Sequence, residues 1–393
     1  MTIDELRALL TPEGLRLLDE IGELASTTDV ARAVTTLRRA GHTADLVAAV
    51  VGQARLRTRA AAKFGEFARR MLFTRAGLEQ ATRLEVAALH AGRFRAAGVA
   101  RVADLGCGIG GDALGLAGIG LDVVAVDADE VTAALAAYNL APFGAEVRHA
   151  RAEDVDLDGV EAVWLDPARR TAGHTETRRV AASGYTPALD WVLDLARRLP
   201  AGVKLGPAFD RDRIPAGCEA QWIGVDGSTI ELVLWSGTLA RPGVGRAAVV
   251  IRGGAAHELT AAADAPDAPA RPLGAFVHEP DGAVIRARLI GDVAQALDAG
   301  MLAEGIAYLT SDAARTSPFV QSFRVREELP VDVRSLGRAL RERGIGRLEI
   351  KKRGVDVDPA VLRAKLKLAG PEEATLLLTR TTAGRRAILA DRV

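Results

Sequence analysis

The sequence contains little cysteine, histidine or tyrosine, and it has no excess of charge of either sign. Its 393 residues include 2 Cys, 6 His and 3 Tyr, and its 51 Lys and Arg balance 51 Asp and Glu. Two cysteines exclude a disulfide framework, and they suit a reducing compartment. The histidines show no paired spacing with one another or with cysteine, so we expect no metal site. Balanced charge means that any basic surface must arise from local asymmetry.

Long apolar runs and a targeting signal are also missing. The sequence has no stretch of about 18 apolar residues, the length that a membrane helix needs. Its opening, MTIDELRALL, lacks the basic segment and following apolar segment of a secretory signal. We therefore expect a cytoplasmic protein with no membrane partner. Nothing in the sequence indicates its oligomeric state.

Hydrophobic patterning divides the chain into four parts. Residues 1–98 read as helices, including one that we expect to run unbroken over 75–98. Residues 99–238 alternate short apolar strands with helices, which predicts an α/β fold with a parallel sheet and crossover helices. Residues 239–322 are expected to form a small α+β connecting domain. Residues 323–393 read strand, helix, strand, helix, strand, strand, which predicts a second small α+β domain.

A glycine-rich turn in VADLGCGIGGDALGLA joins a strand to a helix, a geometry that lets a ligand approach the backbone and the helix-start amides. Gly106, Gly108 and Gly111 match the dinucleotide pattern G-x-G-x-x-G. Asp104, Gly106, Gly108 and Gly110 match D-x-G-x-G-x-G, which resembles the first motif of S-adenosylmethionine (SAM) methyltransferases. Asp104 discriminates between the two, because its carboxylate would repel a pyrophosphate and attract a ligand that carries an ammonium and a sulfonium.

Acidic residues follow the next three predicted strands as well. Asp127 ends the second strand, where a carboxylate can accept the hydroxyls of a ribose. Glu153 or Asp154 follows the third strand, near the expected adenine edge, and Asp166 follows the fourth. The carboxyl ends of parallel strands meet in one crevice, which is where ligands bind in open α/β sheets. Over roughly residues 75–240 the chain resembles the class I SAM methyltransferases, which implies a Rossmann-like sheet with SAM as cofactor.

The segment AVWLDPARR ends an apolar run in Asp166-Pro167. In methyltransferases that act on the exocyclic amines of bases, this strand ends in Asp, Asn or Ser, then Pro-Pro and an aromatic residue. The acid and the proline carbonyl hold the amine there, and the aromatic ring stacks on the base. Asp166 and Pro167 match that pattern, Ala168 replaces the second proline, and Arg169 replaces the aromatic. A guanidinium can stack on a base or clamp a phosphate, so the resemblance implies catalytic roles for Asp166, Pro167 and Arg169.

Asp-Pro-x-Arg also resembles the RNA 5-methyluridine methyltransferases, which attack the base with a cysteine placed just after the next strand. The next strand here, VKLGPAFD, is followed by no such cysteine, since Cys107 and Cys218 lie elsewhere, so this branch is set aside. Other readings stay open: a methyltransferase for a protein or a small molecule, a non-catalytic module that binds SAM or RNA, and, more remotely, a nicotinamide oxidoreductase.

The segments FTRAGLEQATRLEVAALHAGRF, GCGIGGDALGLA, VDADEVTAALAAYNL and KLGPAFD together resemble a bacterial methyltransferase family with a C-terminal THUMP-like domain. This resemblance covers nearly the whole chain. The chain is more distantly similar to cap-guanine N2 methyltransferases, which also carry a helical domain before the cofactor fold. The resemblance implies RNA methylation and RNA as the partner, without naming a target atom.

The tail is basic although the whole chain is neutral. Residues 323–393 hold 17 Lys and Arg against 10 Asp and Glu, so their net charge is +7. Arg347, Lys351, Lys352 and Arg353 cluster on one predicted strand, and alternation places Lys351 and Arg353 on one face. Such a face suits RNA phosphates, and the competing interpretation is a sheet edge kept soluble by its charges. Three tyrosines in the whole chain argue against base stacking by this tail.

Overall fold

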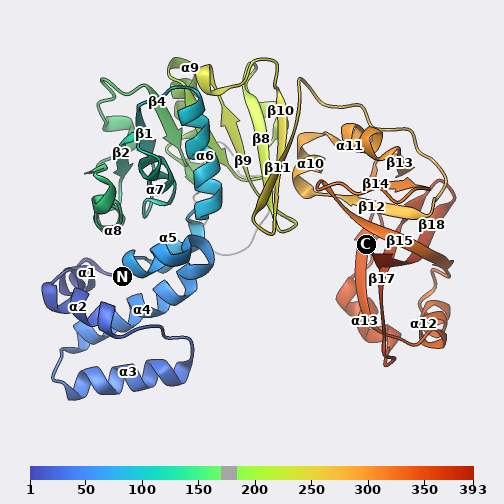
Figure 1. Cartoon of the computed structure of the whole chain (residues 1–393), viewed down its shortest axis with the longest axis horizontal. Helices are drawn as coiled ribbons and strands as arrows, with labels where there is room; N and C mark the ends of the chain where they lie inside the picture. Colours follow the sequence, from blue (N-terminus) through green and yellow to red (C-terminus); the bar gives the residue numbers. More distant parts are fainter. Residues whose placement is uncertain (170–183) are drawn as a thin grey trace. The chain divides into compact units, whose positions relative to one another are not determined.

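The computed structural model describes residues 1–169 and 184–393, which form two compact units (Figure 1). Unit 1 comprises Met1–Cys218 with Leu234–Ala240, and unit 2 comprises Glu219–Val233 with Arg241–Val393. The four-part division expected from the sequence, with boundaries after residues 98, 238 and 322, stays a prediction. Among the described residues, none of the helices combines the length and the apolar character that crossing a bilayer requires.

The N-terminal part of unit 1 is helical because its capping residues stand at the helix ends. The Thr11 hydroxyl accepts the N–H of Gly14, with Pro12 in the first turn of its helix, and Gly65 ends the longest helix at φ +54°. The elements of this part are α1 (Ile3–Leu9), α2 (Pro12–Glu20), α3 (Thr27–Arg39), α4 (Ala44–Phe64), η1 (Gly65–Arg70), α5 (Arg75–Gln80) and α6 (Leu84–Ala96).

The expectation of one unbroken helix over 75–98 is wrong, because the helix breaks between α5 and α6. Lys63 Nζ lies 2.8 Å from each of three carbonyl oxygens at the end of α5, which satisfies groups that a continuing helix would have used. Thr82, within the break, is buried and donates its hydroxyl to Asp112 at 2.6 Å. Tertiary partners therefore override a local pattern that favours helix.

The principal sheet has nine strands in the order β11-β10-β8-β9-β7-β4-β1-β2-β3. Its pairs β1–β2, β1–β4, β2–β3 and β4–β7 are parallel, as the alternation of strands and helices predicts. The strands are β1 (Arg101–Leu105), β2 (Asp122–Asp127), β3 (Glu146–His149), β4 (Ala162–Leu165), β7 (Ala201–Leu205), β8 (Glu219–Val225), β9 (Ser228–Trp235), β10 (Arg246–Arg252) and β11 (Ala255–Ala261). The helical elements along them are α7 (Gly111–Gly118), α8 (Glu130–Leu140), η2 (Ala141–Phe143), η3 (Ala152–Asp154), α9 (Leu189–Arg198), η5 (Arg211–Arg213) and η6 (Gly237–Leu239). A separate pair joins β5 (Ala168–Arg169) to β6 (Tyr185–Thr186).

An aromatic cluster fills the core of unit 1 next to α6. Trp164 of β4, Trp235 of β9 and Phe94 of α6 are at most 1% exposed, and the two tryptophan ring centroids are 5.8 Å apart. The ring of His90, also on α6, lies 4.4 Å from that of Trp164. Aromatic pairs of this kind add about 0.5–1.5 kcal/mol each beyond burial, so α6 and His90 are held firmly against the sheet.

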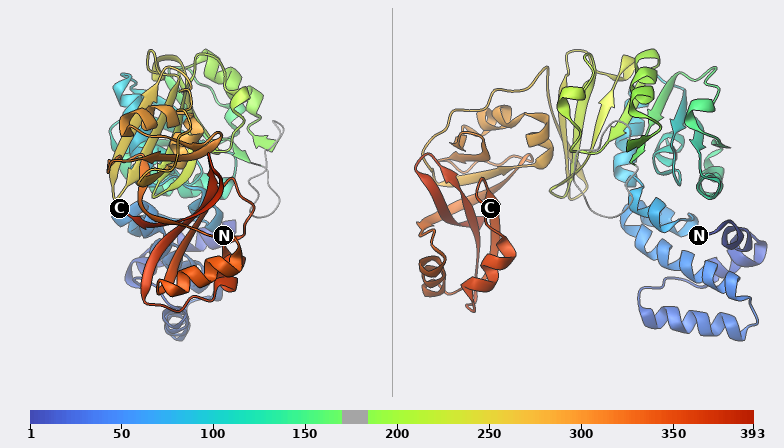
Figure 2. Two further views of the ribbon diagram at one scale, coloured as in Figure 1. Left: turned by 90° about the vertical axis from the view of Figure 1, so that its right-hand side faces the viewer. Right: turned by 180° about the vertical axis from the view of Figure 1, so that it is seen from behind.

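Unit 2 contains a second sheet of seven strands in the order β13-β14-β12-β15-β18-β17-β16. Its elements are β12 (Phe276–Pro280), α10 (Gly282–Ala287), α11 (Ile290–Leu297), β13 (Gly300–Ala303), β14 (Ile306–Ser311), β15 (Val320–Leu329), α12 (Val333–Glu342), β16 (Ile345–Arg353), α13 (Pro359–Leu366), β17 (Glu372–Thr381) and β18 (Gly384–Arg392). The strand and helix order expected for 323–393 is confirmed, although the expected boundary after 322 falls inside β15. Helices α12 and α13 lie against this sheet (Figure 2). Buried leucines of both helices pack in one core with its strands.

Candidate cofactor and acceptor site

In the glycine-rich loop that follows β1, any residue with a side chain would strain the backbone at three glycine positions. Gly106, Gly108 and Gly110 have φ values of +97°, +56° and +88°. A Cβ atom on Gly106 would lie 3.0 Å from the Asp166 carbonyl oxygen, and one on Gly110 would lie 3.1 Å from the Leu140 side chain. The loop therefore packs directly against the end of β4 and leads into helix α7. A Cβ atom on Gly108 would meet no atom within 4 Å, so the backbone is open to a ligand at that position.

Asp104 of β1 carries a carboxyl group in the interior of unit 1. Its side chain is 1% exposed, and neither oxygen has a hydrogen-bond partner among residues 1–169 and 184–393. Burial, followed by the nearby carboxylates of Asp112 and Asp166, raises its pKa well above the ordinary value. A buried, unpartnered carboxylate is costly unless a cation pairs with it, so this position fits the ammonium of SAM.

Asp127 ends β2 and holds the glycine loop. Its two oxygens accept the N–H groups of Gly108 at 3.0 Å and of Asp129 at 2.9 Å. Partial burial raises its pKa, and the backbone hydrogen bonds counteract that effect only in part. A carboxylate oxygen accepts more than one hydrogen bond, so Asp127 retains capacity for ribose hydroxyls.

The two acids expected near the adenine edge lie in η3, directly after β3. Glu153 Oε1 is 3.1 Å from a guanidinium nitrogen of Arg151, and an oxygen of Asp154 is 3.8 Å from the same side chain. Glu153 is 25% exposed, whereas Asp154 is 69% exposed. Both acids thus stand at the carboxyl end of the third strand, where the sequence places them.

Asp166, directly after β4, is held by a lysine that the sequence analysis did not single out. Lys204 Nζ, from the end of β7, is 2.6 Å from Asp166 Oδ2 and 2.8 Å from the Thr82 hydroxyl. The Lys204 side chain is 13% exposed and that of Asp166 is 34% exposed, so water screens this ion pair only partly. The only local signal for Lys204 is its place at the end of the strand VKL.

A second buried acid lies behind this pair. Asp112 of α7 has one oxygen 2.8 Å from Nδ1 of His90 and the other 2.6 Å from the Thr82 hydroxyl. Burial alone would raise the pKa of Asp112, but the Lys204 ammonium and the hydrogen bonds from His90 and Thr82 outweigh it and lower the pKa to about 2. Asp112 is therefore ionised, and it shares Lys204, at 3.7 Å, with Asp166. No sequence motif pointed to this network, because its members lie on helices α6 and α7, on strand β7 and in the segments that follow α5 and β4.

Pro167 and Arg169 are the other residues of the reaction centre expected from the sequence. Pro167 is buried after β4, and the backbone of Arg169 pairs with Tyr185 across β5 and β6. The side chain of Arg169 and the whole of Arg170 lie outside the described residues.

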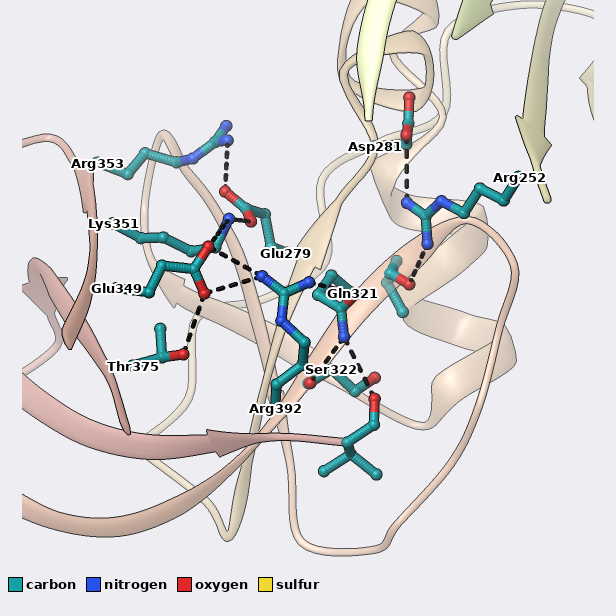
Figure 3. A network of polar contacts seen from close by, with 12 residues as sticks. Arg252, Glu279, Asp281, Gln321, Ser322, Glu349, Lys351, Arg353, Thr375 and Arg392 are labelled. Atoms are coloured by element: carbon teal, nitrogen blue, oxygen red, sulfur yellow. Dashed lines mark hydrogen bonds and ion pairs between the residues drawn. The ribbon is translucent and has the colours of Figure 1, made fainter. Parts of the chain in front are cut away.

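The four cations expected to bind RNA lie in unit 2. Figure 3 shows two of them, Lys351 and Arg353, beside Glu279. Lys351 Nζ is 2.6 Å from Glu279 of β12, and the Arg353 guanidinium is 3.6 Å from the same carboxylate. Arg347 forms an ion pair with Glu373. Lys352 is exposed. Lys351 and Arg353 share a face, as alternation predicts, but that face is engaged with strand β12.

Lys351 and Arg353 also lie over aromatic rings. Lys351 Nζ is 5.7 Å from the ring centroid of Phe323, and the guanidinium carbon of Arg353 is 5.1 Å from that of Tyr308. Contacts of this type stabilise the fold by about 0.5–1 kcal/mol or more when the cation is partly desolvated. Both residues therefore have a structural role, whatever they contribute to binding.

Comparison with known proteins adds family information to this geometry. A family model described as THUMP domain-like matches residues 320–392, and a model for a domain of unknown function (DUF8688) matches residues 2–60. A crystal structure from Porphyromonas gingivalis W83, assigned as a methyltransferase, superposes with a TM-score of 0.71 at 20% identity and covers 94% of this chain and 99% of that one. At this identity the likeness shows the fold alone.

Sequence relatives are more informative. An uncharacterized S-adenosylmethionine-dependent methyltransferase from Mycobacterium tuberculosis, found in two strains, is 36% identical over 340 residues. The match covers 84% of this chain and 91% of the relative. The resemblance inferred from the strand-end acids is thereby confirmed at the level of the family and its cofactor. This chain belongs to the S-adenosylmethionine-dependent methyltransferases.

Proposed function

We propose that the protein transfers a methyl group from SAM to a base of an RNA substrate. The observation that carries the proposal is the position of Asp166. Its backbone packs against the cofactor loop at Gly106, and its carboxylate is paired with Lys204 at 2.6 Å. A carboxylate next to the cofactor loop can accept a hydrogen bond from the amine or hydroxyl that receives the methyl group.

The cofactor roles follow from the strand-end acids. SAM supplies an electrophilic methyl group when bound. In this proposal Asp104 binds the ammonium and Asp127 the ribose hydroxyls, while Glu153 or Asp154 contacts the adenine edge. Gly106, Gly108 and Gly110 keep the backbone close to the ligand, as their positive φ values allow.

The acceptor roles follow from Asp166 and its neighbours. Asp166 would accept a hydrogen bond from the acceptor group and take its proton. The acceptor lone pair would bond to the methyl carbon as the methyl–sulfur bond breaks, its electron pair staying on sulfur in the S-adenosylhomocysteine that leaves. Lys204 holds the Asp166 carboxylate in one orientation, and positioning of this kind is the main source of catalysis in a direct transfer. The Pro167 carbonyl and Arg169 are assigned to holding the target nucleotide.

RNA is the substrate class that the tail favours. Residues 320–392 match the THUMP domain-like model, and the net charge of 323–393 is +7. An acceptor on a protein or a small molecule is the main alternative. A non-catalytic binding module is a weaker one, because Asp166-Pro167 is intact.

A labelling experiment tests the proposal. The purified full chain is incubated with methyl-tritiated SAM and, separately, with total cellular RNA or total cellular protein, with nuclease and protease controls and the Asp166→Asn variant. We expect nuclease-sensitive label with the wild-type protein and little with the variant. Label only in protein would replace RNA as the substrate class. No label in either fraction, with SAM binding intact, would favour the non-catalytic module.

A further inference from the structure

We propose that the groove between α12 and α13 binds the phosphate backbone of RNA. The four cations of β16 that the sequence predicts for this role (Arg347, Lys351, Lys352 and Arg353, the β16 stripe) do not supply the main contact in this proposal. The proposal rests on the proposed function for the identity of the polyanion. The groove is a hollow of about 570 Å³ lined by Val333, Arg334, Arg341, Lys365 and Lys367. Its lining contains four cationic side chains and no acid.

The two helices expose these cations because their apolar faces are used elsewhere. Leu336 and Leu340 of α12 and Leu362 and Leu366 of α13 are at most 5% exposed and pack in one core with strands β15–β18. The four cations of the groove lie beside these leucines in the sequence and are exposed, because the leucines take the faces that meet the sheet. The cationic lining of the groove thus follows from the burial of the leucine faces of α12 and α13.

Arg341 ties the two helices together at the groove. Its guanidinium donates to the Leu366 carbonyl oxygen at 2.7 Å, which holds the charge at the junction of α12 and α13. A Cβ atom on Gly337 would lie 3.1 Å from this guanidinium, so the glycine leaves room for it. An arginine fixed in this way loses little side-chain entropy when it contacts a phosphate.

The groove and the β16 stripe differ in how their charge is neutralised. Within residues 1–169 and 184–393, the side chains of Arg334, Lys365 and Lys367 form no ion pair with an acid, whereas Lys351 and Arg353 share Glu279. An RNA phosphate that meets a cation already paired with a carboxylate must displace that carboxylate. Unpaired cations have no such cost, and phosphate–cation contacts release the counterions condensed on RNA. The groove therefore has the larger electrostatic driving force for RNA.

Two variants of the full chain with equal loss of charge test the assignment. The groove variant combines Arg334→Gln, Lys365→Gln and Lys367→Gln. The control variant combines Lys352→Gln, Arg380→Gln and Arg385→Gln, which removes three exposed cations outside the groove. The probe is a fluorescein-labelled RNA stem-loop with a single-stranded overhang, and its affinity is measured by anisotropy over a series of salt concentrations.

We expect the groove variant to reduce the slope of log affinity against log salt by about 2–2.7, since each lost contact contributes about 0.7–0.9. The control variant should change the slope by less than half as much. Binding of S-adenosylhomocysteine (SAH) and the melting temperature should be unchanged in both, which shows that the fold is intact. Equal slopes in the two variants, or a wild-type slope in the groove variant, would overturn the proposal.

The outcome is separable from that of the proposed function. If RNA is labelled but the groove variant binds it like wild type, the groove assignment fails and RNA methylation stands. If the groove carries the salt slope but RNA is never labelled, RNA methylation fails and the groove stands as an RNA-binding site. A wild-type protein that does not bind the stem-loop would overturn the groove assignment.

Discussion

At the scale of single residues, Asp104 and Asp112 show how two buried acids on neighbouring elements acquire opposite properties. Asp112 is surrounded by His90, Thr82 and Lys204, which lower its pKa to about 2. Asp104 has no hydrogen-bond partner among the described residues, and burial raises its pKa. The difference lies in the partners and not in the burial, since both residues are at most 6% exposed. Asp104 is thus the acid whose charged form a bound cation would favour.

Replacing Asp104 by Asn should stabilise the free protein and weaken cofactor binding. Because the pKa of Asp104 is raised in the folded protein, folding favours its protonated form. The resulting contribution to the free energy of unfolding is full below the ordinary carboxyl pKa of about 4, and it is lost as the pH rises through the raised pKa. Asp104→Asn removes that loss, so the free energy of unfolding at neutral pH should rise by on the order of 1–3 kcal/mol. Urea unfolding of both proteins, at mildly acidic and at neutral pH, measures this difference in the free energy of unfolding.

The same variant should lose about 1.5–3 kcal/mol of SAH binding, because the ammonium loses a charged partner. SAH affinity of the wild type should fall as pH decreases, since the ligand then competes with a proton on Asp104. The control is Asp122→Asn, because Asp122 is exposed and begins β2, at the end away from Asp127. It should change neither the free energy of unfolding nor the affinity for SAH. An Asp104→Asn protein that binds SAH as tightly as wild type would remove Asp104 from the cofactor site.

Lys204 should act on turnover and not on cofactor affinity. Asp166→Asn is expected to lower kcat by roughly 10²–10⁴-fold if the carboxylate takes a proton. Lys204→Met should lower kcat in the same direction with little change in SAH affinity, and Lys204→Arg should recover part of the loss because it retains the charge. Steady-state kinetics with labelled SAM provide the comparison. A Lys204→Met enzyme with wild-type kcat would show that the 2.6 Å ion pair is only structural.

At the scale of elements, the glycine loop and the break between α5 and α6 determine the geometry of the site. The break places Thr82 where its hydroxyl contacts both Asp112 and Lys204. The loop places Gly106 against the backbone of Asp166. Each element is short, and its conformation depends on a partner from another part of the chain. Small backbone changes here should therefore have larger effects than changes on the surface.

Gly106→Ala and Gly108→Ala form a matched pair for this loop. Both glycines have positive φ, which costs an alanine about 1–2 kcal/mol. Only at Gly106 would the new Cβ atom also collide, at 3.0 Å, with the Asp166 carbonyl oxygen, whereas that of Gly108 meets nothing within 4 Å. We expect a greater loss of stability and of SAH affinity for Gly106→Ala, measured by thermal unfolding and calorimetry. Equal losses would mean that the loop can move away from Asp166.

At the scale of the whole molecule, the C-terminal sheet joins segments that the sequence analysis assigned to two domains. Strand β12 pairs with β14 on one side and with β15 on the other. Val277, Leu302 and Tyr308 share a buried core with Phe323 and Ile388, and all five are fully buried. Residues 276–311 thus depend on strands from the family-matched segment for their packing.

A chain that ends after residue 322 should therefore lose packing in residues 276–311 as well as the proposed RNA site. Removal of β16–β18 and most of β15 exposes Val277, Leu302 and Tyr308, and losing the burial of each large apolar side chain costs about 1.5–3 kcal/mol. We expect residues 276–311 to become sensitive to limited proteolysis, while the truncated chain still binds SAH. If 276–311 stays protected in the truncated chain, the predicted domain boundary after residue 322 would be supported.

The sequence by itself determined where three acids of the candidate site lie in the sheet and the order of elements in the tail. Asp104, Asp127 and Asp166 lie in or directly after adjacent parallel strands, so topology alone brings them to one edge of the sheet. The alternation of strands and helices in 323–393 predicts the observed order for a similar reason, because local periodicity encodes local structure.

Only the tertiary structure decided which charges are paired. Lys204 contacts Thr82 across 122 positions of sequence, and Lys351 contacts Glu279 across 72. No local period relates such residues, so a strand of cations reads as a binding stripe until its partners are known. The α5–α6 break is a further case, since Lys63 of α4 contacts carbonyl groups from 15 to 18 positions further along the sequence, beyond the reach of a helical period. Charge and hydrogen bonding act through space, whereas the patterns in a sequence report only neighbours along it.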